Sequence, residues 1–196
     1  KDNDELLEAK LTTGDSQVML ALGSGKAIRF EEGKTRPMGR NASGVRGITL
    51  AHKDDQVIGM IAVNDAESDI LVVSENGYGK RSTLEDYRIT NRGGKGVKTI
   101  NVTEKTGNLV AIKVVMDVDD LMIINKSGIA IRMAVADLRV MGRATQGVRL
   151  IKVREGDSIA AVAKVMHDDD DIEELDGDIE NGTTLDNDES QTEIQE

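Results

Sequence analysis

The sequence predicts an all-β, propeller-like fold followed by a disordered acidic tail. Three observations predict it: an internal repeat, four short strand-like segments in each copy, and a last segment with very little apolar content. Alignment of Gly25, Gly77 and Gly128 brings three copies into register at spacings of 52 and 51 residues, without a gap for about 30 positions. Four short strands at a period near 50 residues are typical of a propeller blade.

Each copy opens with an apolar run, a polar turn and a second strand. We expect these pairs of strands at 18–22 and 26–30, 70–73 and 78–82, and 121–124 and 129–133. The aligned glycine ends the turn, where it can take the positive φ that a tight hairpin demands, and Asn76-Gly77 is a favoured pair there. One β-hairpin per copy follows from this pattern.

A loop of about a dozen residues then leads to a third and a fourth strand. The third starts at Gly44, Gly96 or Gly147, 19 positions beyond each hairpin glycine, and the fourth covers 57–63, 109–115 and 159–165. Residues 6–11 align with the fourth strand alone, so we expect the chain to begin within a longer protein, at the end of a preceding blade. The expected division is therefore 1–15 for that blade end, 16–66, 67–117 and 118–166 for three four-stranded blades, and 167–196 for the tail.

The net charge of −11 conceals two regions of opposite sign. From His167 onward there are 14 acidic residues and no Lys or Arg, which leaves 22 acidic against 25 basic residues in positions 1–166. The body therefore carries a charge of about +3. The acidic net charge of the whole chain does not argue against a nucleic-acid partner. The tail lacks the apolar content to fold.

Several classes of protein are excluded by composition. The chain has no cysteine, so it has neither disulfides nor thiolate zinc sites, which fits a reducing compartment. No apolar run approaches the roughly 20 residues that a transmembrane helix needs. The first residues do not resemble a signal peptide.

Basic residues recur at matched positions in every copy. The second strands carry Arg29, Arg81 and Arg132, the loops carry Arg36, Arg88 and Arg139 and then Arg40, Arg92 and Arg143, and the third strands carry Arg46, Lys98 and Arg149; Lys26, Lys80 and Lys95 complete the set. Equivalent positions of a propeller-like ring share one height, so we expect these cations to form curved belts. A curved belt of positive charge suits the phosphate backbone of bent DNA, bound with little sequence preference.

A repeated arginine can instead pair with a repeated acid inside its own blade. This alternative stays open for each single arginine, and it is weaker for the loop positions because no acidic residue repeats beside them. The loop of residues 91–96 holds three glycines and two cations, a composition that can form an anion-binding nest. It is not a nucleotide P-loop, because G-x-x-x-x-G-K-[ST] is missing.

The strings ENGYGKR, RPMGRNASGVRGI and VMGRATQGVRLI make the resemblance specific. With the blade period and the acidic tail, residues 5–166 resemble the C-terminal β-pinwheel domains of the bacterial DNA gyrase A family. The resemblance implies a six-bladed pinwheel, of which this chain is the last three blades, that wraps DNA and so supports ATP-dependent negative supercoiling. It also implies an A2B2 complex with the gyrase B protein and the remainder of the gyrase A protein, in the bacterial cytoplasm at the nucleoid. No cofactor is expected in this chain, since ATP and Mg²⁺ belong to other parts of that complex.

The signature box of the family, Q-R-R-G-G-K-G, belongs to the first blade. Residues 90–96 occupy the equivalent loop of a later blade and differ from it at two positions, where Thr90 and Asn91 stand for Gln and Arg. We therefore do not transfer the role of the box to this loop, and we expect this chain alone to wrap DNA poorly.

The residues give no catalytic constellation. His52 and His167 have no partner motif, and Tyr78 and Tyr87 align with Ile129 and Leu138, which favours packing over chemistry. Two other functions stay open: the equivalent domain of topoisomerase IV, and a protein-binding propeller whose belts meet an acidic partner. We also hypothesise that the acidic tail competes with DNA for the basic belts.

Overall fold

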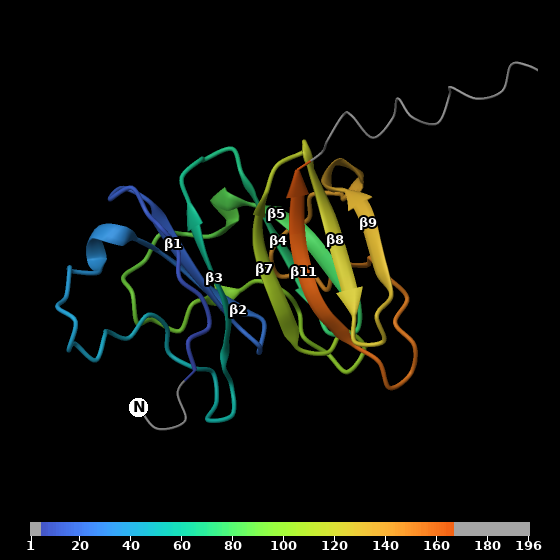
Figure 1. Cartoon of the computed structure of the whole chain (residues 1–196), viewed down its shortest axis with the longest axis horizontal. Helices are drawn as coiled ribbons and strands as arrows, with labels where there is room; N and C mark the ends of the chain where they lie inside the picture. The colour runs from blue at the N-terminus through green and yellow to red at the C-terminus, as the bar shows by residue number, and fades with distance from the viewer. Residues whose placement is uncertain (1–4, 167–196) are drawn as a thin grey trace, which may run out of the picture.

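The computed structural model describes residues 5–166 and is all-β apart from three single 3₁₀ turns. The strands are β1 (Gln17–Leu22), β2 (Lys26–Glu31), β3 (Val57–Val63), β4 (Asp69–Ser74), β5 (Tyr78–Thr83), β6 (Val97–Lys98), β7 (Leu109–Val115), β8 (Asp119–Asn125), β9 (Ala130–Ala134), β10 (Val148–Arg149) and β11 (Ile159–Met166), and the 3₁₀ turns are η1 (Glu32–Lys34), η2 (Leu84–Asp86) and η3 (Val135–Asp137). They form three antiparallel sheets that stand side by side (Figure 1). The all-β, propeller-like prediction is confirmed; the acidic tail predicted at 167–196 lies outside the described residues.

The third strands of the second and third repeats join the sheet of the repeat before them. The sheet orders are β3-β1-β2-β6, β10-β5-β4-β7 and β11-β8-β9. The expectation that one repeat supplies all four strands of its own blade is therefore wrong. The exchange is anchored at the hairpin, where the amide of Thr99 donates to the carbonyl of Gly25 at 2.8 Å and that of Leu150 to the carbonyl of Gly77 at 2.9 Å.

Two expected strands are not formed: the third strand of the first repeat and the strand expected near the N-terminus. Residues 45–46 and 6–11 have no regular secondary structure, and the side chain of Leu11 is fully exposed. A strand needs a hydrogen-bonded neighbour. By the pattern of β6 and β10, the neighbour of residues 45–46 would be the outer strand of a preceding sheet, and residues 5–166 contain no such strand.

The hairpin glycines have the predicted backbone conformation. Gly25, Gly77 and Gly128 have φ values of 79°, 78° and 86°, a region that side chains with a Cβ seldom enter. Each donates its amide to the residue three positions earlier, at 2.9 to 3.1 Å, which closes the turn between the first two strands of the repeat.

Two apolar cores lie between neighbouring sheets and fix their spacing. Met19 and Ile61 of the first sheet pack with Ile70 and Leu109 of the second, and a matching cluster joins the second sheet to the third. The strands β3 and β7 contact each other, as do β7 and β11, so they form the inner side of the array. β6 and β10 lie at the opposite edge of their sheets and form its outer side.

Candidate nucleic-acid interface

The glycine-containing loop of the second repeat crosses to the outer edge of the first. The amide of Thr90 donates to the carbonyl of Arg29 at 2.8 Å, and the amide of Gly93 donates to that of Gly47. At the crossing, the guanidinium of Arg92 donates through Nη1 to the carbonyl oxygen of Arg46 and through Nε to that of Lys34, both at 3.0 Å. Cations of two successive repeats thus lie next to each other.

The third repeat makes the same crossing to the second. The amide of Met141 donates to the carbonyl of Arg81 at 2.9 Å, and Nη1 of Arg143 donates to the carbonyl of Lys98 at 2.8 Å. Arg143 and Lys98 are the repeat equivalents of Arg92 and Arg46. Arg92 and Arg143 therefore tie the second and third repeats to the repeat before each of them. The fold in this way sets the spacing of cations along the outer side.

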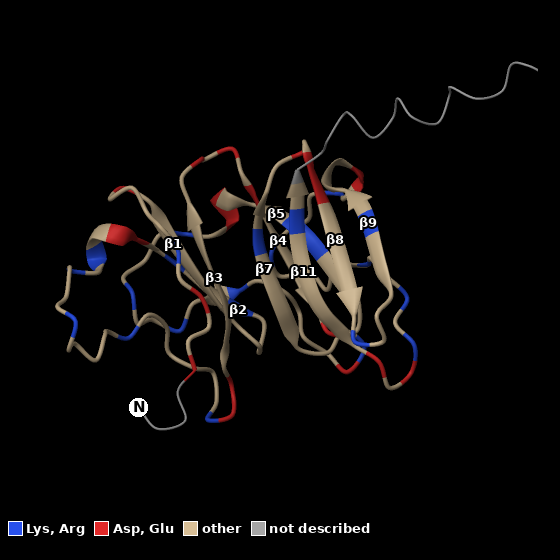
Figure 2. Ribbon diagram, in the orientation of Figure 1, with Lys and Arg blue, Asp and Glu red and all other residues tan. Residues whose placement is uncertain are grey.

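We call the cations of these loops and outer strands the rim cations. They are Arg36, Arg40, Arg46, Arg88, Arg92, Lys95, Lys98, Arg139, Arg143 and Arg149. Arg92 and Arg143 are partly exposed and the other eight are exposed. Within residues 5–166 no carboxylate lies within 4.0 Å of their charged groups. Figure 2 shows several of them on the long loop after β2.

Two lysines face each other directly across the outer strand pair of the first sheet. Lys26 of β2 and Lys98 of β6 are partners in the antiparallel register. Like charges at directly opposed positions destabilise a sheet. Neither ammonium has a carboxylate within 4.0 Å in the described part of the chain, so a bound anion would relieve this repulsion.

The loop of residues 91–96 borders a cavity of about 210 Å³. Arg29, Arg88 and Lys95 line it, together with Gly94 and Gly96. Gly96 has a φ of 68°, and a Cβ there would stand 2.5 Å from the carbonyl oxygen of Ala27, so the backbone packs too closely for any other residue. Three cations thus surround a small cavity, and the anion-binding nest that the sequence suggests stays a prediction.

The second-strand arginines are held by partners inside the fold. Arg29 donates through Nε to Gln17 Oε1 at 2.6 Å and through Nη1 to the carbonyls of Leu84 and Tyr87 in the next repeat. Arg132 donates through Nε to Asp120 Oδ2, also at 2.6 Å. These arginines therefore act in the first place as braces within the array.

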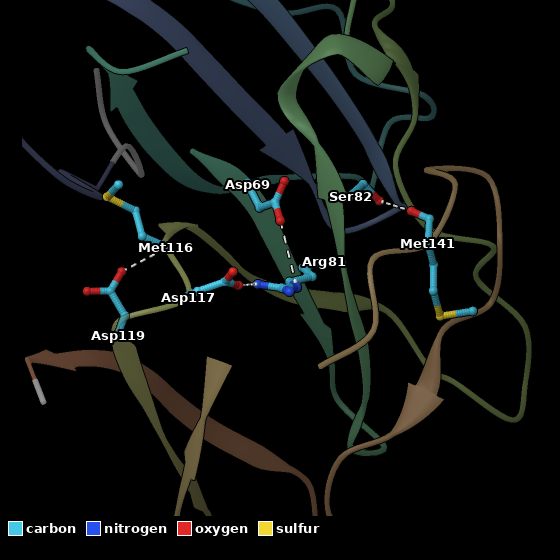
Figure 3. A network of polar contacts seen from close by, with 7 residues as sticks. All are labelled: Asp69, Arg81, Ser82, Met116, Asp117, Asp119 and Met141. Carbon is cyan, nitrogen blue, oxygen red and sulfur yellow. Dashed lines mark hydrogen bonds and ion pairs between the residues drawn. The ribbon is translucent and has the colours of Figure 1, made fainter. Parts of the chain in front are cut away.

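Arg81 is the most buried of the three. Its guanidinium binds Asp117, and its Nε lies 3.7 Å from Asp69 Oδ2 (Figure 3). Burial raises the pKa of Asp69, and the charge of Arg81 opposes that rise. Arg81 is 8% exposed, which leaves little of it for a ligand.

A sequence signal for these pairs exists. Gln17, Asp69 and Asp120 each stand 12 positions before the arginine they contact, and they occupy equivalent places in the three repeats. A position that holds an acid or an amide in every copy predicts such a brace. The paired-acid alternative thus describes the second strands, whereas no such partner is found beside the rim cations in residues 5–166.

Lys80 is buried beneath the loop that carries Arg143. Its ammonium donates to the carbonyl of Gly142 at 2.7 Å and to Ser82 Oγ at 3.0 Å. Burial lowers the pKa of Lys80 to about 8, Asp86 opposes the shift and Arg143 adds to it. The equivalent residues are Ile28 and Ile131, so this lysine supports one loop and is not part of a repeated belt.

Sequence reasoning missed three cations near the hairpin of the second sheet. Lys105, Lys152 and Arg154 gather with Arg149 around a cavity of about 430 Å³. The equivalent residues in the preceding repeat are Lys53, Asn101 and Thr103. None of the three positions holds a cation in every copy, so a search for cations common to all three repeats does not find them.

The described residues add three further findings. They contain no group of three or more His, Asp or Glu side chains placed to hold a metal ion. None of their helical segments has the length and hydropathy required to cross a bilayer. Tyr87 is 1% exposed and packs in the first core, as the alignment with Leu138 predicts.

Comparison with known proteins gives one consistent family. The family model of the DNA gyrase C-terminal domain, a β-propeller, matches residues 23–64, 68–116 and 119–166. The A subunit of DNA gyrase from Staphylococcus epidermidis is 46% identical over 171 residues, which cover 87% of this chain and 19% of the relative. That of Staphylococcus aureus strain MRSA252 is 45% identical over 175 residues, 89% of this chain and 20% of the relative. The chain thus spans about a fifth of the length of the curated relatives it matches.

Solved structures agree on the fold. A DNA gyrase A C-terminal domain has a TM-score of 0.72 and 26% identity, over 79% of this chain and 52% of that one. A C-terminal domain of DNA topoisomerase IV has a TM-score of 0.75 over 80% of this chain and 49% of that one, but only 22% identity, which shows the fold alone. The family model matches more than half of the chain, in three consecutive segments, and so the chain belongs to the family of DNA gyrase A C-terminal domains.

Proposed function

We propose that this chain binds double-stranded DNA along its rim cations and wraps it without sequence preference. The observation that carries the proposal is the crossing of loops between repeats. Arg92 lies against Arg46 and Arg143 against Lys98, at equivalent places and without carboxylates nearby in the described residues. Such an array offers a bent polyanion regularly spaced contacts to its phosphates. The second-strand arginines and Lys80 support the loops from beneath, and Lys26 adds to the charge at the outer edge.

The magnitudes are adequate for bending DNA. If each of three repeats neutralises about two phosphates, the slope of log K against log salt is near −5. Holding roughly 20–30 base pairs through a bend costs about 1–6 kcal/mol by elastic estimates, which several phosphate contacts can offset. Backbone contacts combined with bending resemble the strategy of other wrapping proteins.

For the whole protein we propose the role that the names of the relatives suggest. As a part of the gyrase A protein, the domain would support ATP-dependent negative supercoiling by an A2B2 complex with the gyrase B protein, in the bacterial cytoplasm at the nucleoid. ATP and Mg²⁺ would be bound elsewhere in that complex. Identity of 46% to a gyrase A protein, against 22% to the topoisomerase IV domain, favours the gyrase assignment.

A charge-matched pair of variants tests the proposal. The first replaces four exposed rim cations by glutamine, at Arg36, Arg40, Arg88 and Arg139. The second replaces four lysines away from the outer strands, at Lys10, Lys53, Lys113 and Lys164. We expect the slope of log K against log salt to become less negative by about 3.6 in the first variant, at roughly 0.9 per lost contact. The second variant should leave this slope unchanged.

The same titrations separate the alternatives. Equal losses in the two variants would show that only overall charge matters. No binding of duplex DNA by the unchanged chain, or binding indifferent to salt, would favour the protein-binding propeller.

A further inference from the structure

A second basic site lies at the hairpin end of the second sheet. We call it the Tyr78 cavity: a space of about 430 Å³ lined by Tyr78, Lys105, Arg149, Lys152, Arg154 and Glu155, among others. It lies where the turn between β4 and β5 meets β10 and the segment after it. Arg149 also belongs to the rim cations, so the cavity is continuous with the proposed DNA path.

Tyr78 orients the cations of the cavity. Its hydroxyl oxygen accepts hydrogen bonds from Nη2 of Arg149 at 2.8 Å and from Nε at 3.3 Å. The guanidinium carbon of Arg149 and the ammonium of Lys105 lie 5.4 and 5.3 Å from the centre of its ring. Two cations beside one aromatic ring are held in place by its electron density. The bond from Arg149 also lowers the pKa of the Tyr78 hydroxyl.

The backbone around the cavity is fixed. The carbonyl of Gly77 accepts from the amides of Leu150 and Ile151 at 2.9 and 3.3 Å, which seats the turn on the strand that carries Arg149. A Cβ at Gly77 would stand 2.4 Å from the carbonyl oxygen of Ile151. The side chains of the turn and of the β10 segment are therefore presented from two backbones that cannot move apart freely.

The charge of the cavity is not neutralised within the described part of the chain. Lys105, Arg149, Lys152 and Arg154 have no carboxylate within 4.0 Å. Asp157, which also borders the cavity, is engaged elsewhere: it accepts from Ser127 Oγ at 2.8 Å and from Asn125 Nδ2 at 2.7 Å. Four cations thus share a cavity whose remaining acid is Glu155.

We propose that the Tyr78 cavity binds a phosphate group of the DNA backbone. This inference rests on the proposed function and extends it: the duplex leaves the rim at Arg149 and passes over the hairpin end of the second sheet. A phosphate has the charge and the several acceptor oxygens that two guanidinium and two ammonium groups can share. At the equivalent place between the first and second repeats, Lys26 stands in place of Tyr78, and Asn101 and Thr103 stand in place of Lys152 and Arg154. The aromatic ring and two of the four cations are therefore specific to the second sheet.

The test removes two exposed lysines and leaves the structural contacts in place. Lys105→Gln with Lys152→Gln is compared with Lys10→Gln with Lys113→Gln, which removes the same charge from residues that border a different cavity. Binding of a duplex of roughly 30 base pairs is titrated over salt, and the ring resonances of Tyr78 are followed by NMR, assigned with Tyr78→Phe. We expect the slope of log K against log salt to become less negative by about 1.8 in the cavity variant and to stay unchanged in the control. DNA should shift the Tyr78 resonances of the unchanged chain.

Other outcomes overturn the assignment and say which part failed. If the cavity variant matches its control while the four-residue rim variant still weakens binding, DNA bypasses the cavity and the proposed function stands. If neither variant changes binding, both proposals fail together. If inorganic phosphate shifts the Tyr78 resonances but the salt dependence of DNA binding is unaltered by the cavity variant, the cavity takes a free phosphate and not the duplex.

Discussion

Nη1 of Arg92 donates a hydrogen bond to the main-chain carbonyl oxygen of Arg46, 3.0 Å away across the boundary between two repeats. Arg143 and Lys98 repeat the relationship one step along the array, at 2.8 Å. A loop arginine is thereby both a joint between sheets and a member of the charged outer edge. The geometry of the array and the spacing of its cations are set by the same contacts.

Replacement of Arg92 by lysine separates these two roles. Lysine keeps the charge but lacks the planar fork that reaches the carbonyls of Lys34 and Arg46 together. We expect DNA affinity to fall roughly two- to fivefold, an energy in the range of one hydrogen bond, while the salt dependence keeps its slope. Arg88→Lys is the control, because the side chain of Arg88 makes no hydrogen bond within residues 5–166. If the two variants have the same DNA affinity across a salt titration, the hydrogen bonds of Arg92 do not hold the two repeats together for DNA binding.

Arg81→Ala tests the bracing role of the second strand. The substitution leaves Asp69 partly buried without its compensating charge. We expect a loss of roughly 2–4 kcal/mol in the free energy of unfolding, reduced from the fully buried case because Asp117 is exposed to solvent. Urea denaturation measures it, with Arg139→Gln expected to stay within about 0.5 kcal/mol of the unchanged chain. If Arg81→Ala is as stable as the unchanged chain, Arg81 does not brace the fold.

Two hairpin glycines with the same backbone conformation are expected to differ in cost. Gly128→Ala meets only the strain of a positive φ, since nothing lies within 4 Å of its Cβ, and we expect a loss of about 1 kcal/mol. Gly77→Ala adds a clash with Ile151, and we expect roughly 2–4 kcal/mol. Urea midpoints of the two variants compare them directly. Similar losses would mean that the β10 segment is not seated on this turn.

The pKa of Lys80 predicts a pH dependence of stability. Because burial lowers this pKa to about 8 in the folded state, against 10.5 when exposed, the unfolded chain binds more protons between these values. Stability due to this residue therefore rises as the pH goes from about 8 to about 10.5, by roughly 2 kcal/mol once partial access of solvent is allowed for.

Lys80→Met provides the comparison that isolates this effect. Its stability at pH 7 should be equal to or above that of the unchanged chain, and the difference between the two should shrink as the pH rises through this window. A difference that is constant from about pH 7 to about pH 11 in urea titrations would show that Lys80 does not titrate there.

The hairpins of this fold can be predicted from the sequence, but the sheet that each short outer strand joins cannot. Gly25, Gly77 and Gly128 mark the hairpins because only a positive φ closes them, and the strands on either side follow from apolar runs. The partner of β6 could not be predicted, because a run of two residues carries no signal for the sheet it joins. The blade boundaries at 16–66, 67–117 and 118–166 stay predictions.

The candidate site divides in the same way. All rim cations except Lys95 stand at positions that hold a cation in every copy, and their role in binding DNA stays a prediction. Arg29, Arg81 and Arg132 repeat as well, but their contacts show that they brace the fold. Neither Lys105 nor Lys152 stands at a position that holds a cation in every copy. Folding brings Lys105 to Arg149, which lies 44 positions away in the chain.

The affinity of the 196-residue chain for duplex DNA, measured against salt concentration, tests the central claim most directly. Cations from three successive repeats that share one polyanion predict a slope of log K against log salt near −5. The affinity should then fall about a thousandfold between roughly 50 and 200 mM. A slope near zero, or no complex at the lower concentration, would contradict the claim that these arginines and lysines grip a DNA backbone.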